Sequence, residues 1–229
     1  MNRVLISSVF LFGILLTGCE PEQNVSTGSA QEKIFPETSA TVMPSPYEAQ
    51  TTTQASLLSE PNWAILFAGH DLDSFNSVGD AEWNIIDDYV EASGNVRSFL
   101  VTKGHYTNFL LHAEFWPGPG TNSGIFIRND DPDVITAEGG YEINIRDLNE
   151  ENPQNQTGSI VNHVPPASNF LSENQWNTYQ IEAQGDRILV RLNDTVSVDA
   201  ELEAHQSGPI AFQINGGLIR WRNIRIRPL

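Results

Sequence analysis

From Pro61 onward, short stretches of alternating apolar and polar residues constrain the fold more than any other feature of the sequence. Clusters of Gly, Asn, Asp and Pro interrupt these stretches roughly every ten residues, a spacing typical of antiparallel sandwiches and barrels. No stretch shows the sustained period of an amphipathic helix. The pattern predicts an all-β domain with strands at residues 83–86, 109–116, 123–128, 141–145, 178–183, 187–192, 210–214 and 219–227.

Each predicted strand divides into a core face and an outer face, because successive side chains of a strand point to opposite sides of the sheet. In residues 109–116, for example, Phe109, Leu111 and Phe115 share one face, and this leaves Glu114 and Trp116 on the other. The polar and aromatic residues that the alternation places away from the core are Glu114, Trp116, Asn122, Phe126, Arg128, Glu142, Asn144, Arg146, Gln213 and Asn215.

These outer faces combine carboxylates, amides and guanidinium groups with aromatic rings. Sugar hydroxyls are bound by groups that offer several hydrogen-bonding atoms, and the apolar faces of a pyranose ring pack on aromatic platforms. The combination therefore indicates a carbohydrate site. An ordinary solvated sheet face is the alternative, because antiparallel sheets routinely alternate in this way.

The N-terminus follows the pattern of a secretory signal. Arg3 precedes an apolar run over residues 4–16, which is shorter than the roughly 20 residues that span a bilayer. The run ends in Leu16-Thr17-Gly18-Cys19, which resembles the bacterial lipobox. We therefore expect residues 1–18 to be a lipoprotein signal peptide, with Cys19 as the lipidation site. A plain cleaved signal with a chance cysteine is the alternative.

Residues 19–59 are rich in Ser, Thr, Pro, Gln and Glu, and we expect a disordered, lipid-anchored tether in front of a domain at residues 60–229. Cys19 is the single cysteine, so the domain has no internal disulfide. The net charge of −17 makes nucleic acid an improbable partner. We expect an exported protein, anchored to the cell envelope. The outer membrane is favoured, since Glu20 is not the Asp linked to inner-membrane retention.

Several sequence blocks resemble the 3-keto-disaccharide hydrolase domain family over the range from Trp63 to Leu229. The most specific blocks are Thr-Asn-Ser-Gly-Ile-Phe-Ile-Arg at 121–128 and Gly-Tyr-Glu-Ile-Asn-Ile-Arg-Asp at 140–147. Further blocks at 66–72, 157–160, 208–213 and 222–224 occur in the same order along the chain as in the family. The resemblance implies an antiparallel jelly-roll β-sandwich of the concanavalin type and cleavage of glycosides whose sugar carries a 3-keto group. It places Asn122, Arg128, Glu142 and Gln213 on the active face.

The sequence departs from the family pattern at three positions. Asn144 stands where the family usually has Gln, Val161 where it commonly has Tyr, and Asn215 where it commonly has His. The last two departures remove side chains that could transfer protons. They favour the main alternative to an enzyme, which is a non-catalytic carbohydrate-binding lipoprotein. A structural or adhesive surface protein is the third hypothesis.

A 3-keto group acidifies the proton at C2 of the sugar, so the glycosidic bond at C1 can break by elimination. We expect Glu142 to act as the base or acid, with Glu114 as a second carboxylate. Direct hydrolysis by two carboxylates is the alternative. The residues that we expect to bind substrate are Asn122, Arg128, Asn144, Gln213, Asn215, Phe126, Trp116 and His163.

No cofactor is clearly implied by the sequence. The histidines do not show metal-ligand spacing. Asp130, Asp131 and Asp133 offer the hard oxygens that calcium prefers, but a solvated turn is the favoured interpretation. A divalent metal that assists the leaving oxygen remains an open alternative.

Overall fold

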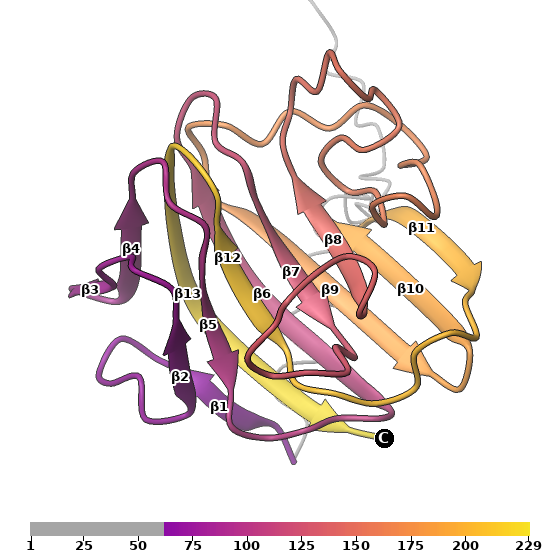
Figure 1. Cartoon of the computed structure of the whole chain (residues 1–229), viewed down its shortest axis with the longest axis horizontal. Coiled ribbons are helices and arrows are strands. Elements are labelled where there is room, and N and C mark those ends of the chain that lie inside the picture. The colour runs from indigo at the N-terminus through magenta and orange to yellow at the C-terminus, as the bar shows by residue number, and fades with distance from the viewer. Residues whose placement is uncertain (1–61) are drawn as a thin grey trace, which may run out of the picture. The chain divides into compact units, whose positions relative to one another are not determined.

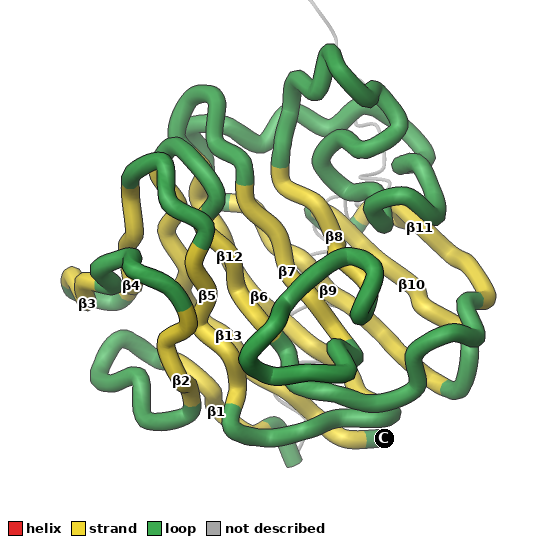
Figure 2. Tube along the Cα trace, viewed as in Figure 1, coloured by secondary structure: helices red, strands yellow, loops and turns green. Residues whose placement is uncertain are grey.

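The computed structural model describes residues 62–229, so the predicted signal peptide, the lipidated Cys19 and the tether lie outside the described residues. Residues 62–229 contain two antiparallel β-sheets that pack face to face (Figure 1). Strands and loops account for the whole of this range (Figure 2). No helix within it is long and apolar enough to cross a membrane. The predicted all-β class and antiparallel sandwich are confirmed.

The larger sheet has eight strands. Seven of them follow the order β11 (Thr195–Glu201), β10 (Arg187–Leu192), β9 (Asn177–Gln184), β6 (Phe109–Pro117), β13 (Leu218–Pro228), β4 (Tyr89–Ser93) and β3 (Asn84–Ile86). The eighth, β1 (Ala64–Phe67), pairs with β13. The smaller sheet has the order β2 (Phe75–Val78), β5 (Ser98–Thr102), β12 (Ala211–Ile214), β7 (Ser123–Ile127) and β8 (Tyr141–Ile145).

Every strand expected from alternation is present, with ends that agree to within one residue. The strands that the pattern missed are short or lack alternation. β5, for instance, has all five of its residues buried, so its two faces do not differ in polarity. A strand that is covered on both sides gives no period-2 signal.

The main core lies between the two sheets, where aromatic rings from both sheets meet. Phe115 stacks on Tyr179 with centroids 4.8 Å apart, and Phe212 meets Trp221 edge to face at 5.1 Å. All four side chains are fully buried. Each buried ring of this size contributes about 2 kcal/mol or more through burial alone. A core of this kind can hold the domain together without a disulfide.

A second, smaller apolar cluster covers part of the outer face of the smaller sheet. The loop from β7 to β8 crosses in front of this sheet (Figure 1) and packs Ile135 against Phe99 and Phe126. Arg97 fixes the loop by donating a hydrogen bond from Nη2 to the Ile135 carbonyl at 3.0 Å. The loop therefore divides the outer face into a covered half and an open half.

A buried carboxylate anchors the long segment between β8 and β9. Asp147 accepts hydrogen bonds from Thr157 Oγ1 at 2.7 Å and from Ser172 Oγ at 2.6 Å. The backbone N–H of Glu173 donates to the same carboxylate at 2.9 Å. These bonds hold the segment against the end of the smaller sheet, where it walls the open half of the outer face.

Candidate active site

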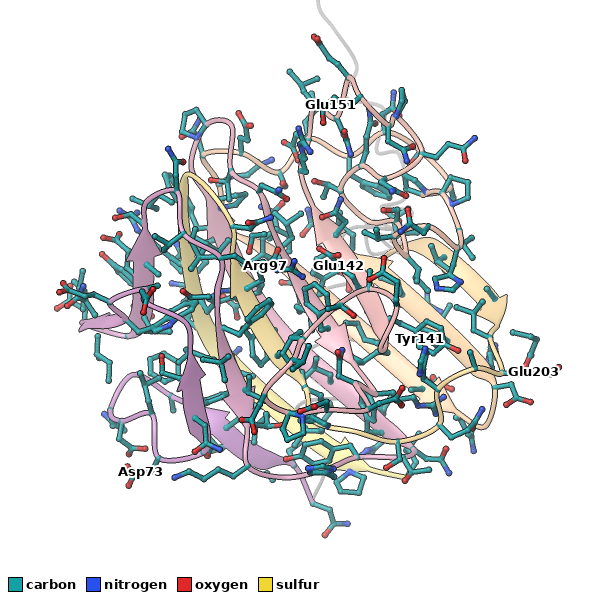
Figure 3. All side chains as sticks on the ribbon, in the orientation of Figure 1. Asp73, Arg97, Tyr141, Glu142, Glu151 and Glu203 are labelled. Carbon is teal, nitrogen blue, oxygen red and sulfur yellow. The ribbon has the colours of Figure 1, made fainter. Side chains whose placement is uncertain are left out.

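The open half of the outer face holds a polar pocket of about 280 Å³, which we call the Glu142 pocket. In Figure 3, Glu142 and Arg97 lie side by side over the centre of the smaller sheet. The pocket is lined by Arg97, Asn122, Ala137, Glu138, Glu142, Asn144, Arg146, Asn149, Asn155, Val161, Gln213 and Asn215.

Strand alternation brings most of the predicted residues to this pocket. Glu142 and Asn144 both project outward from β8, and Gln213 projects outward from β12. Asn122 and Asn215 lie at adjacent strand ends, where Asn215 N donates to the Asn122 carbonyl at 2.9 Å. Five of the residues expected to act on or bind substrate therefore share one pocket.

The Glu142 carboxyl is the central titratable group of the pocket. Its pKa is raised to about 7, chiefly by burial; the charge of Arg97 lowers the pKa in part, and the charge of Glu138 adds a smaller rise. Among residues 62–229, Arg97 acts on the carboxyl through its charge without forming an ion pair, and the carboxyl accepts no hydrogen bond. A carboxyl with a pKa near neutrality can accept a proton in one step and return it in another.

Gly124 makes room for the Glu142 side chain. Strands β7 and β8 pair so that Gly124 lies opposite Asn144 and Phe126 lies opposite Glu142. A Cβ atom at Gly124 would lie 3.1 Å from Glu142 Oε1 and 3.0 Å from the Ile143 carbonyl oxygen. Such contacts are tighter than ordinary packing allows, so the absent side chain at this position helps to set where the carboxyl lies.

Gln213 presents an unsatisfied amide to the pocket. Its side chain is 2% exposed, and its Oε1 atom has no hydrogen-bond partner among the described residues. Leaving a buried polar atom unpaired costs about 1–3 kcal/mol. A hydroxyl group of a bound ligand could supply the missing partner.

Asparagine side chains build one wall of the pocket and satisfy one another. Asn144 Nδ2 and Asn149 Nδ2 both donate to the Asn155 carbonyl, at 2.6 Å and 2.8 Å. Asn155 Nδ2 in turn donates to Asn162 Oδ1 at 3.0 Å. Asn144 thus holds the wall, and its amide is largely committed to the protein itself.

Sequence analysis did not assign several lining residues to the site: Arg97, Glu138, Arg146, Asn149 and Asn155. Alternation placed Arg146 on the polar face beside Glu142, so that signal was available. The other four lie in loops, where side-chain direction has no period to read.

Glu114 and Trp116 lie on the other side of the sandwich, so the prediction that they share a site with Glu142 is wrong. Both project outward from β6 in the larger sheet, and the core separates them from the smaller sheet. Glu114 pairs with Arg222 Nε at 2.7 Å, and Trp116 lies under the Arg220 guanidinium at 4.4 Å.

Arg128 is fully buried and does not reach the pocket, so its predicted role in substrate binding is wrong. Its φ of 56° turns it out of the β7 alternation. Its guanidinium donates instead to three backbone carbonyls, those of Thr107 (from Nη2, 2.6 Å), Gly185 (2.8 Å) and His205 (3.3 Å). The side chain ties three loops together at one end of the sandwich.

Phe126 and His163 also lie outside the pocket. Phe126 is on the predicted face, but the β7–β8 loop buries it completely, so it offers no platform to a sugar. His163, two residues after Val161 in the sequence, is exposed. Its ring packs edge to face on Tyr141, with ring centroids 5.3 Å apart.

The acidic and histidine side chains of residues 62–229 do not gather into a metal-binding cluster. Within residues 62–229, no group of three or more His, Cys, Asp or Glu side chains could hold a metal ion. The acidic residues after β7 make turn contacts instead. Asp131 accepts a hydrogen bond from Asp133 N at 2.8 Å, and Asp130 Oδ1 lies 3.2 Å from His205 Nδ1.

Solved structures share this architecture. Two proteins from Parabacteroides distasonis ATCC 8503, each named a “putative glycosyl hydrolase”, are 25% and 18% identical to this chain, with TM-scores of 0.62 and 0.65. The first match covers 73% of this chain and 99% of that protein, and the second covers 80% and 97%. The carbohydrate-binding module CBM66 from Bacillus subtilis is 16% identical, with a TM-score of 0.52 over 67% of this chain and 95% of the module.

No curated protein matches the chain significantly. Residues 62–227, however, match the family described as the 3-keto-alpha-glucoside-1,2-lyase-like domain, and this range includes every strand residue of the sandwich except Pro228. The match agrees with the resemblance carried by the blocks at 121–128 and 140–147 and with the concanavalin-type jelly roll. The chain therefore belongs to the 3-keto-alpha-glucoside-1,2-lyase-like domain family.

Proposed function

We propose that this protein cleaves the glycosidic bond of 3-keto glycosides in the Glu142 pocket, with Glu142 as the base. The observation that carries the proposal is the Glu142 carboxyl with its pKa of about 7, set among amide and guanidinium groups. Family membership supplies the substrate class. The pocket supplies a group that can remove a proton near neutral pH.

The chemistry follows from the acidity of the proton at C2. Glu142 removes this proton, and the electron pair of the C–H bond forms the enolate with the C3 carbonyl. When the carbonyl re-forms, a C1–C2 double bond appears and the C1–O bond to the leaving group breaks. The protonated Glu142 can then give its proton to the departing oxygen. Addition of water across the C1–C2 bond completes net hydrolysis.

Other residues of the pocket have roles that match this sequence of steps. Arg97 carries the positive charge that would stabilise the enolate oxygen. The unpaired Gln213 Oε1 would accept a hydrogen bond from a sugar hydroxyl, and Asn122 lies beside it at the end of the neighbouring strand. Both contacts would hold C2 within reach of Glu142.

The test compares Glu142→Gln with the wild-type protein on a 3-keto disaccharide and on the same disaccharide without the keto group. Wild-type protein should release sugar only from the keto substrate, and Glu142→Gln should lose at least about 100-fold in kcat. Glu182→Gln, a surface change on the larger sheet, is the matched control. Undiminished turnover by Glu142→Gln would end the assignment.

A non-catalytic sugar-binding role is the second candidate, and the composition of the pocket favours it specifically. Val161 and Asn215 line the pocket at positions where the family pattern commonly has Tyr and His. A pocket without those groups has fewer means of moving protons. This alternative predicts saturable binding of the 3-keto disaccharide with no release of sugar by the wild-type protein.

We also propose that the domain works at the cell envelope, held by lipid on Cys19. The signal-like N-terminus and the lipobox-like segment before Cys19 support this location. Cys19→Ser should move the protein from the membrane fraction to the soluble fraction. Equal membrane association of both forms would contradict the anchor.

A further inference from the structure

The larger sheet carries a second pocket on its own outer face, on the opposite side of the sandwich from Glu142. This pocket has a volume of about 360 Å³, and we call it the Glu114 pocket. It is lined by Ala68, Asp88, Glu114, Arg222, Asn223 and Arg225. The proposed function uses none of these residues.

A β-bulge shapes this pocket. The register between β13 and β6 shifts between Arg222 and Arg225, and Asn223 within the shift has a φ of 49°. The bulge turns the Asn223 side chain toward β6, where Nδ2 donates to Glu114 Oε1 at 2.7 Å. Bulges that re-aim a side chain are frequent beside functional sites, and a non-glycine residue at positive φ is strained.

Glu114 is held as an ionised acceptor at the pocket wall. Partial burial alone would raise its pKa, but the neighbouring His112, Asn223 and Arg222 outweigh this and lower the pKa to about 2. Arg222 Nε donates to Glu114 Oε2 at 2.7 Å. Oε1 accepts the bond from Asn223 and lies 3.7 Å from His112 Nε2. A carboxylate has about four lone-pair sites, so Glu114 keeps acceptor capacity for a ligand.

Arg225 is the donor that completes the pocket. Its guanidinium makes no hydrogen bond, ion pair or ring contact with any of the residues 62–229. The two carboxylates of the lining, from Asp88 and Glu114, balance the two guanidinium groups of Arg222 and Arg225. A charge-balanced pocket with both donors and acceptors suits a neutral hydroxyl-rich ligand better than an ion, because a hydroxyl donates and accepts at once.

Aromatic rings lie next to this pocket. The Trp176 ring lies 4.0 Å from the Arg222 guanidinium carbon, and Tyr89 packs against Trp176 at 6.0 Å. Both side chains are half-buried. Neither ring lines the pocket, but Trp176 packs on Arg222, which does, so apolar surface adjoins the hydrogen-bonding groups. A pyranose ring is bound by this combination of polar groups and aromatic surface.

We propose that the Glu114 pocket is a second carbohydrate-binding site, which holds a neutral sugar through Arg225, Asn223 and Glu114 beside Trp176. The site lies on the opposite sheet from the Glu142 pocket, so a sugar bound there would not compete with substrate. The proposal does not depend on whether the Glu142 pocket is catalytic.

Tryptophan positions make the two pockets distinguishable. The chain has five tryptophans, and none lines the Glu142 pocket, whereas Trp176 lies beside the Glu114 pocket. The full chain, labelled with fluorotryptophan, would be titrated with maltose, sucrose and trehalose and followed by fluorine NMR. Trp176→Phe assigns the signal. We expect at least one of these sugars to shift the Trp176 signal saturably.

Three variants test which pocket is responsible. Arg225→Ala should weaken the sugar affinity at least about tenfold, and Ala68→Phe, which fills the pocket without removing a hydrogen bond, should abolish the shift. Arg191→Ala, a matched arginine on the same sheet, should leave the affinity unchanged. The shift should also persist in a Glu142→Gln, Gln213→Ala double variant. An absent shift, or a shift that only this double variant removes, would overturn the proposal.

Discussion

At the scale of single residues, Glu142 is an ionisable, half-buried side chain with no ion-pair or hydrogen-bond partner among residues 62–229, which is a costly state for a carboxylate. Its pKa of about 7 lies above the value of an unfolded glutamate, so the folded protein holds this proton more tightly. The stabilisation of the folded state by this proton is fully present below the pKa of the unfolded glutamate. It is lost as the pH rises through about 7. Function at this residue therefore opposes stability at alkaline pH.

Glu142→Gln should remove the loss of stability that ionisation of Glu142 causes at alkaline pH. Gln resembles the protonated acid but cannot ionise, so the variant should unfold at nearly the same urea concentration as the wild-type protein at pH 4.5. At pH 8 it should be more stable by about 3 kcal/mol, because a pKa raised by about 2.5 units costs about 1.4 kcal/mol per unit once the wild-type carboxyl ionises. A difference between the two proteins that does not change with pH would show that Glu142 has an ordinary pKa.

Arg128 is fully buried, and its contacts are purely structural. Arg128→Ala should lower the free energy of unfolding by about 3 kcal/mol, because the carbonyls of Thr107, Gly185 and His205 lose their donors. Arg191→Ala, on the sheet surface, should cost less than about 0.5 kcal/mol. If Arg128→Ala kept its stability and instead lost sugar binding, Arg128 would belong to the site after all.

At the scale of elements, alternation located strands well and sites only partly. It correctly placed Glu142 and Glu114 on outer faces, but a sandwich has two outer faces and the period does not say which one. It also treated an outer face as exposed, whereas the β7–β8 loop buries Phe126. Which strands share a sheet, and which loop covers which face, depends on contacts between residues far apart in the chain.

The β7–β8 loop forms one edge of the Glu142 pocket, to which it contributes Ala137 and Glu138. Ile135→Ala should loosen its hold on Phe99 and Phe126, so amide hydrogen exchange at residues 129–140 should accelerate and KM for the 3-keto substrate should rise. Val134→Ala removes a neighbouring side chain that is 58% exposed and should change neither quantity. If Ile135→Ala and Val134→Ala had equal effects on hydrogen exchange and on KM, packing of Ile135 would not be what positions the loop at the site.

At the scale of the whole described domain, the two sheets carry pockets of different chemistry on their outer faces. They share one core, yet the smaller sheet carries a pocket around a titratable carboxyl and the larger sheet a charge-balanced pocket beside an aromatic pair. An enzyme that holds a sugar on one face while it cleaves a glycoside on the other is consistent with both. Family membership is the basis on which we propose a substrate for the first pocket, and the charges and bulge geometry are the basis of the proposed ligand of the second.

The central claim is that cleavage begins with removal of the C2 proton by Glu142. It is tested most directly by comparing a 3-keto disaccharide with its C2-deuterated form as substrates of the wild-type protein. If proton removal limits the reaction, kcat/KM should be clearly lower for the deuterated substrate. The 3-keto sugar that is released should carry no deuterium at C2. Equal rates, with sugar released and deuterium fully retained at C2, would instead indicate direct displacement at C1 and contradict the account.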